Sequence, residues 1–190
     1  MFLFHSVAEY ANRLSNSFTQ TASLSKRITI CALLAALAAV LQSAGGFIPV
    51  VGLMISPFAT APVIVSTVLS LRYSFVGYIL IILLLFLIQP SEVLIFAFTT
   101  GLLGFGIGFG YYFFKKRLSI LLTGAIFLLG GIVVVLFIFK FPLLGPSFKA
   151  NSNMSFFLSL SGFCFLYSWL WMEISLVLLK RIATMFSRRS

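Results

Sequence analysis

The sequence predicts an all-α integral membrane protein, a compact bundle of six transmembrane helices with both termini in the cytoplasm. Of its 190 residues, 61% are hydrophobic and only 8% are charged, whereas roughly a quarter of the residues in soluble domains are charged. Long apolar runs alternate with short polar gaps along the chain. Basic gaps alternate with nearly uncharged gaps, as the positive-inside rule expects of a chain that crosses a bilayer repeatedly.

Residues 1–25 are too polar to cross a membrane. We expect an amphipathic helix on the cytoplasmic leaflet, because apolar side chains recur there at spacings of three and four. These side chains are Phe4, Val7, Ala11, Leu14 and Phe18. A disordered tail is the alternative.

Residues 26–181 form the expected six-helix transmembrane domain, and 182–190 a basic cytoplasmic tail. The expected spans are 28–43, 56–71, 74–88, 93–114, 118–139 and 155–179. Between the first two, Gly45, Gly46 and Pro49 predict a break in the helix. Residues 50–55 are apolar but too short to span alone, so we expect a cap or a re-entrant piece there.

The charges indicate where the protein resides and what it does not bind. The net charge is +10, and the predicted topology places most of the basic residues on the cytoplasmic face of the plasma membrane, where they meet anionic lipid. No basic stripe with interleaved polar residues is present, so we expect no binding of nucleic acid.

The sequence offers little for catalysis. It contains no Asp and a single histidine, His5, in the N-terminal segment. Neither Cys31 nor Cys164 has a CxxC partner. We therefore expect no enzyme activity, no cofactor and no metal site.

Small residues recur at a spacing of four in two predicted helices. Such spacing lets membrane helices approach closely. The first helix carries Ala32 with Ala36 and Ala35 with Ala39, and the fourth carries Gly104 with Gly108 and Gly106 with Gly110. Both sets are open to two interpretations, docking of a partner or packing within the bundle.

Polar side chains gather at the predicted outer face and form the candidate substrate site. They are Gln42, Ser43, Gln89, Glu92, Asn151 and Asn153. Phenylalanines nearby would bury the apolar part of a ligand. For Glu92 the alternative is a structural role in the first turn of a helix, where the helix dipole favours a negative charge.

Glu173 is an acidic residue within the sixth predicted span. A charge at that depth is costly unless it is paired. We expect an ion pair with a basic side chain at the inner surface, for example Lys180 or Arg72, in preference to a role in proton relay.

Taken together, these features resemble the substrate-binding S component of an energy-coupling factor transporter over residues 28–180. The resemblance rests on six short helices, the alanine pairs of the first helix, the glycine-broken loop after it, and the stretches Pro57–Pro62 and Leu71–Gly77.

This resemblance implies that the chain captures a vitamin-like small molecule from outside. It further implies docking through Ala32, Ala35, Ala36 and Ala39 onto a membrane coupling subunit, which a pair of ATPases drives. The alternative is a small polytopic protein that binds other membrane proteins or lipid without transport.

Overall fold

The protein is all-α, with six helical spans. The computed structural model describes residues 8–48, 50–141 and 154–187, and within them six helices are long and apolar enough to cross a membrane. The spans, listed with their irregular segments, are α2 (Leu24–Phe47); α3, η2 and α4 (Val51–Ile55, Ser56–Ala59, Thr60–Leu69); α5 (Leu71–Ile88); α6, η3 and α7 (Ser91–Ile95, Phe96–Thr100, Gly101–Phe113); α8 and η4 (Arg117–Val133, Val134–Ile138); and α9 (Met154–Ser187). The six predicted spans are therefore confirmed, with shifted boundaries.

The turn between the first two spans differs from the prediction. Helix α2 continues through Gly45 and Gly46 and ends at Phe47, so the glycines do not break it. Membrane helices tolerate glycine, because no water competes for the backbone hydrogen bonds. Residues 51–55 are not a separate cap: α3 runs into the 3-10 turn η2 at Pro57 and then into α4 as one span.

Glycine allows a close return at this turn. A Cβ atom at Gly52 would overlap the carbonyl oxygen of Ala44. The absence of a side chain therefore lets the second span start directly against the end of α2.

The N-terminal helix α1 (Ala8–Thr21) packs against the bundle. The side chains of Ala11, Leu14 and Phe18 are buried in the same core cluster as Val68 and Tyr111. The described part of the apolar face that the sequence analysis assigned to lipid therefore contacts protein, which is a correction, and Phe4 and Val7 lie outside the described residues. Arg27 holds the end of α1 by donating from Nε to the carbonyl oxygen of Ala22 at 2.9 Å and from Nη2 to that of Thr19.

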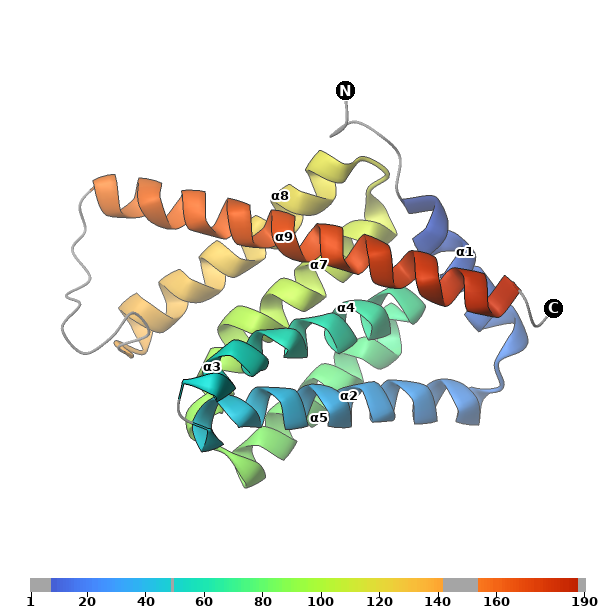
Figure 1. Ribbon diagram of the computed structural model, residues 1–190, viewed down its shortest axis with the longest axis horizontal. Coiled ribbons are helices and arrows are strands. Elements are labelled where there is room, and N and C mark those ends of the chain that lie inside the picture. The colour runs from blue at the N-terminus through green and yellow to red at the C-terminus, as the bar shows by residue number, and fades with distance from the viewer. Residues whose placement is uncertain (1–7, 49, 142–153, 188–190) are drawn as a thin grey trace.

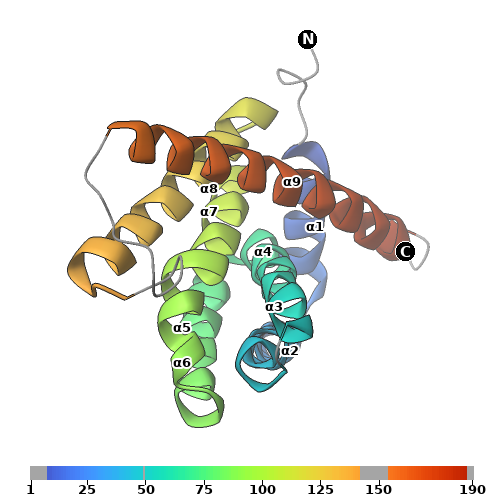
Figure 2. The ribbon, with the colours of Figure 1, turned by 60° about the vertical axis from the view of Figure 1, so that its left-hand side comes forward.

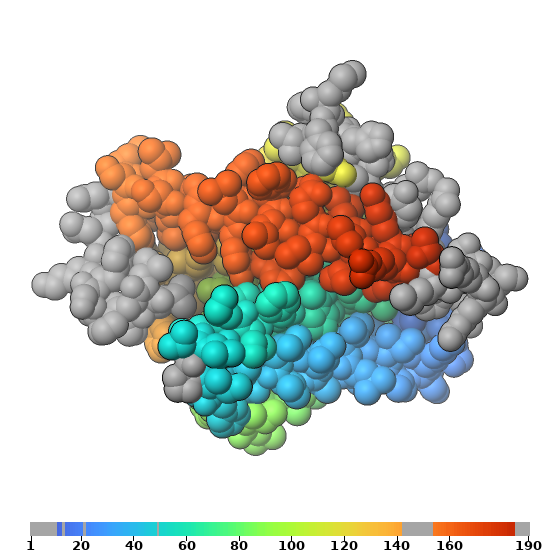
Figure 3. Space-filling view, viewed as in Figure 1, coloured from blue at the N-terminus to red at the C-terminus, as the bar shows by residue number. Residues whose placement is uncertain are grey.

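The helices form two packed groups. One core cluster joins α1, α4, α7, α8 and α9, and a second joins α2, α4, α5 and the segment around Phe96. Figures 1 and 2 show α9 crossing one side of the molecule, with α2 and α5 on the other. The space-filling view in Figure 3 places α9 above α2 on one face, with α4 between them.

The glycines of α7 serve packing inside the bundle. A Cβ atom at Gly104 would lie 2.9 Å from Val63 Cβ of α4, and one at Gly108 would overlap Thr67. On the other side, a Cβ atom at Gly106 would lie 2.8 Å from Phe127 of α8. Of the two interpretations left open, internal packing is the one that the structure supports for this stripe.

Candidate functional site

Three polar side chains from two spans meet inside the bundle. Gln42 Nε2 of α2 donates to Glu92 Oε2 of α6 at 2.8 Å, and Thr100 Oγ1 donates to Gln42 Oε1 at 2.7 Å. Gln42 is fully buried and Glu92 is 5% exposed. The cluster lies at the end of the bundle that carries the α2–α3 and α5–α6 turns, which we call the Glu92 end (Figures 1 and 2).

A π-helical segment places Thr100 in this cluster. Residues Phe96–Thr100 form η3, in which Gly101 N–H donates to the carbonyl of Phe96 five residues earlier. The carbonyl of Thr100 accepts from Thr60 Oγ1 at 3.2 Å, so a fourth element, α4, joins the network. Single π turns inside α-helices occur frequently at functional sites.

The cluster contains a carboxyl group without a basic partner in the described part of the chain. Glu173 has a basic partner, whereas the recorded hydrogen bond of the Glu92 side chain is with Gln42. Burial of a carboxylate beside neutral groups alone is costly. Among the described residues, no basic side chain therefore offsets the cost of ionising Glu92.

Of the six predicted site residues, the structure brings Gln42 and Glu92 together. Ser43 is buried but donates to the carbonyl of Val40 in its own helix at 2.9 Å. Gln89 lies at the same end, beside Gly46, and donates to Ser91 at 3.1 Å. Asn151 and Asn153 lie outside the described residues.

Sequence reasoning missed Thr60 and Thr100. Both are fully or almost fully buried, at 0% and 7% exposure. Threonine is common in membrane helices and usually bonds to its own backbone, so neither residue stands out in the sequence. The only available signal was that both lie near the same end of their spans as Gln42 and Glu92.

The alanines of α2 divide between two faces. Ala35 and Ala39 are each 1% exposed, in the core cluster that also contains Ile81 and Leu85 of α5. Ala36 is exposed and Ala32 is half-buried. As a correction, Ala35 and Ala39 pack inside the bundle, so in this conformation the predicted docking surface is reduced to Ala32 and Ala36.

Glu173 is paired, as expected, but with a residue that the sequence analysis did not name. Arg117 Nη1 lies 3.1 Å from Glu173 Oε1, and Arg117 is buried at the start of α8. Nearby, Tyr111 Oη lies 2.9 Å from Ser175 Oγ. This ion pair joins the start of α8 to α9 at the end of the bundle opposite to Glu92.

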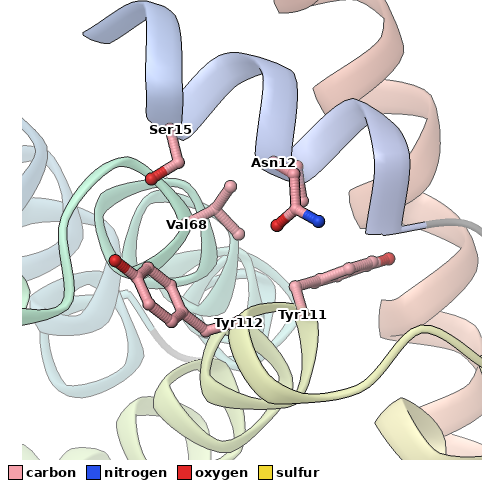
Figure 4. Close-up of a pocket in the computed structure, with 6 residues that line it drawn as sticks. Asn12, Ser15, Val68, Tyr111 and Tyr112 are labelled. Carbon is pink, nitrogen blue, oxygen red and sulfur yellow. The ribbon is translucent and has the colours of Figure 1, made fainter. Parts of the chain in front are cut away.

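A hollow opens near that opposite end, between α1, α4 and α7 (Figure 4). Asn12, Ser15, Val68, Tyr111 and Tyr112 line it, together with Ala11, around about 150 Å³ of empty volume. That volume includes open solvent, so the hollow is a shallow surface depression. Small-molecule sites bury most of their ligand, and this hollow is therefore too small to be the main ligand site.

The fold and the six apolar spans define a multi-pass membrane protein. The chain matches no family model, and no curated protein or solved structure is significantly similar to it.

Proposed function

We propose that this protein is the membrane-embedded substrate-binding subunit of an ATP-driven uptake system of the energy-coupling factor type. In this proposal the protein lies in the plasma membrane, and both of its termini are in the cytoplasm. The Glu92 end faces outward and captures a vitamin-like small molecule. The chain itself carries out no catalysis, and partner ATPases supply the energy.

The buried cluster of Gln42, Glu92 and Thr100 is the observation that carries this proposal. Ionisable residues within membrane spans commonly mark substrate or ion pathways. Glu92 lies near one end of the bundle, where a ligand reaches it without crossing the membrane. The side-chain amide of Gln42 is held in place beside it, because the amide oxygen accepts from Thr100 and the amide nitrogen donates to Glu92. A positioned polar group in an apolar surrounding is the usual design of a small-molecule site.

The exposed face of α2 supports the docking part of the proposal. Ala36 lies on this face, together with Leu33 and Leu37. A small residue between larger ones lets another helix approach closely and gain van der Waals contact. Lipid also contacts such a face, so docking has to be tested directly.

Co-purification tests this function. A tagged chain, extracted from its native membrane in mild detergent, should recover a membrane coupling subunit and two ATPases. Ala36→Trp should lower that recovery severalfold, because the added ring separates the helices. Leu122→Trp is the matched control, since Leu122 is an exposed side chain on α8. Recovery of one unrelated membrane protein, with no ATPase, would instead support a polytopic binding protein without transport.

A further inference from the structure

Glu92 uses one carboxylate oxygen within the protein and leaves the other available. Oε2 accepts the hydrogen bond from Gln42. Among the described residues, no hydrogen bond reaches Oε1. A carboxylate has acceptor capacity at both oxygens, so an additional donor can bind at Oε1.

Gly45 packs directly against the carboxyl group of Glu92. It is three residues after Gln42 on α2, so both residues lie on the helix face toward α6. A Cβ atom at Gly45 would lie 2.9 Å from Glu92 Oε1 and 3.2 Å from Oε2. Any larger residue at this position would therefore press on the carboxyl group.

The charge balance indicates what kind of donor fits. Gln42 and Thr100 supply only neutral groups, and no described Lys or Arg side chain is paired with Glu92. A cationic ligand would supply the missing positive charge and a charge-assisted hydrogen bond, which is stronger than a neutral one. A neutral ligand would leave the buried carboxylate uncompensated.

We infer that the substrate is an organic cation. This inference rests on the proposed function for the role of the site. The ammonium, amidinium or guanidinium nitrogen of the cation donates to Glu92 Oε1, the oxygen that lies next to Gly45.

Protection of Glu92 from a carboxyl reagent tests this inference on the wild-type protein. Purified full-length protein in detergent is treated with dicyclohexylcarbodiimide, which adds to accessible carboxyl groups in apolar surroundings. Peptide mass mapping then locates the adduct. The competitors are N-butylguanidinium and N-butylurea, which have nearly the same shape and differ in charge. The guanidinium should protect Glu92 at about tenfold lower concentration than the urea, as a charge-assisted hydrogen bond predicts.

Two adjacent glycines supply matched variants. Gly45→Ala should abolish the preference for the guanidinium, because its methyl group presses on Oε1. Gly46→Ala should retain the preference, since a Cβ atom at Gly46 meets the flexible side chain of Gln89 instead.

Two results on the wild type would overturn the inference. Equal protection by the urea and the guanidinium would mean that the site does not recognise charge. Absence of any adduct at Glu92, even at an acidic pH at which the carboxyl group is protonated and reactive, would mean that Oε1 is closed. Failure of the proposed function would give a different pattern of results. If the guanidinium were preferred but no coupling subunit or ATPase co-purified with the protein, the cation site would stand and only the transport role would be removed.

Discussion

At the scale of single residues, the polar side chains within apolar spans carry most of the information. Gln42 and Glu92 stand out in the sequence because amides and carboxylates are rare there, and the structure joins them. The partner of Glu173 could not be predicted, because Arg117 lies 56 positions away and reads in the sequence as part of a basic loop. Pairings of this kind depend on how the helices are arranged, which local patterns do not encode.

The hydrogen bond from Thr100 gives the first prediction at this scale. Thr100→Val keeps the shape of the side chain but removes the donor to Gln42 Oε1. We expect the free energy of unfolding to fall by about 0.5–2 kcal/mol, the range for hydrogen bonds between membrane helices and for buried groups that lose a partner. Equilibrium unfolding in mixed detergent would measure it.

Thr123→Val is the control for that measurement. Thr123 donates only to the carbonyl of Ser119 in its own helix, so we expect a change of less than about 0.5 kcal/mol. Equal effects of the two substitutions would show that the bond from Thr100 has no special role in the cluster.

At the scale of helices, the length of the apolar runs was sufficient to predict all six spans, because a membrane helix needs about 20 apolar residues. The helix faces were harder to predict. The sequence could not separate Ala35, which is buried, from its exposed neighbour Ala36, because both lie in a helix that is apolar on every side. The same limit applies to α1, whose apolar face fits lipid and protein equally well by pattern.

Adjacent glycines in α8 give a prediction about helix packing. A Cβ atom at Gly131 would overlap the carbonyl oxygen of Phe98, whereas one at Gly130 meets nothing within 4 Å. Gly131→Ala should lower the free energy of unfolding by about 1–3 kcal/mol through forced backbone shifts. Gly130→Ala should leave it unchanged or raise it by up to about 1 kcal/mol through better helix propensity.

The same unfolding assay would compare both glycine variants with the wild type. If Gly131→Ala were as stable as Gly130→Ala, the close contact between α8 and the segment around Phe98 would be wrong.

At the scale of the whole molecule, the two ends of the bundle differ in chemistry. The Glu92 end holds a buried carboxyl beside neutral groups, and the opposite end holds the Arg117–Glu173 ion pair, with Lys115 exposed close by. Charge alternation along the sequence predicts this polarity, since basic loops remain in the cytoplasm. The buried network of Gln42, Glu92, Thr100 and Thr60 required the three-dimensional arrangement of four elements.

The central claim, that Glu92 belongs to a ligand site, is tested most directly by native mass spectrometry of the detergent-purified protein. Wild type should carry one non-lipid small molecule per chain. Glu173→Gln should retain that molecule, since Glu173 lies at the other end of the bundle, and Glu92→Gln should lose most of it. Retention of the same molecule by Glu92→Gln at wild-type occupancy, or its absence from the wild type purified from its native cell, would contradict the account.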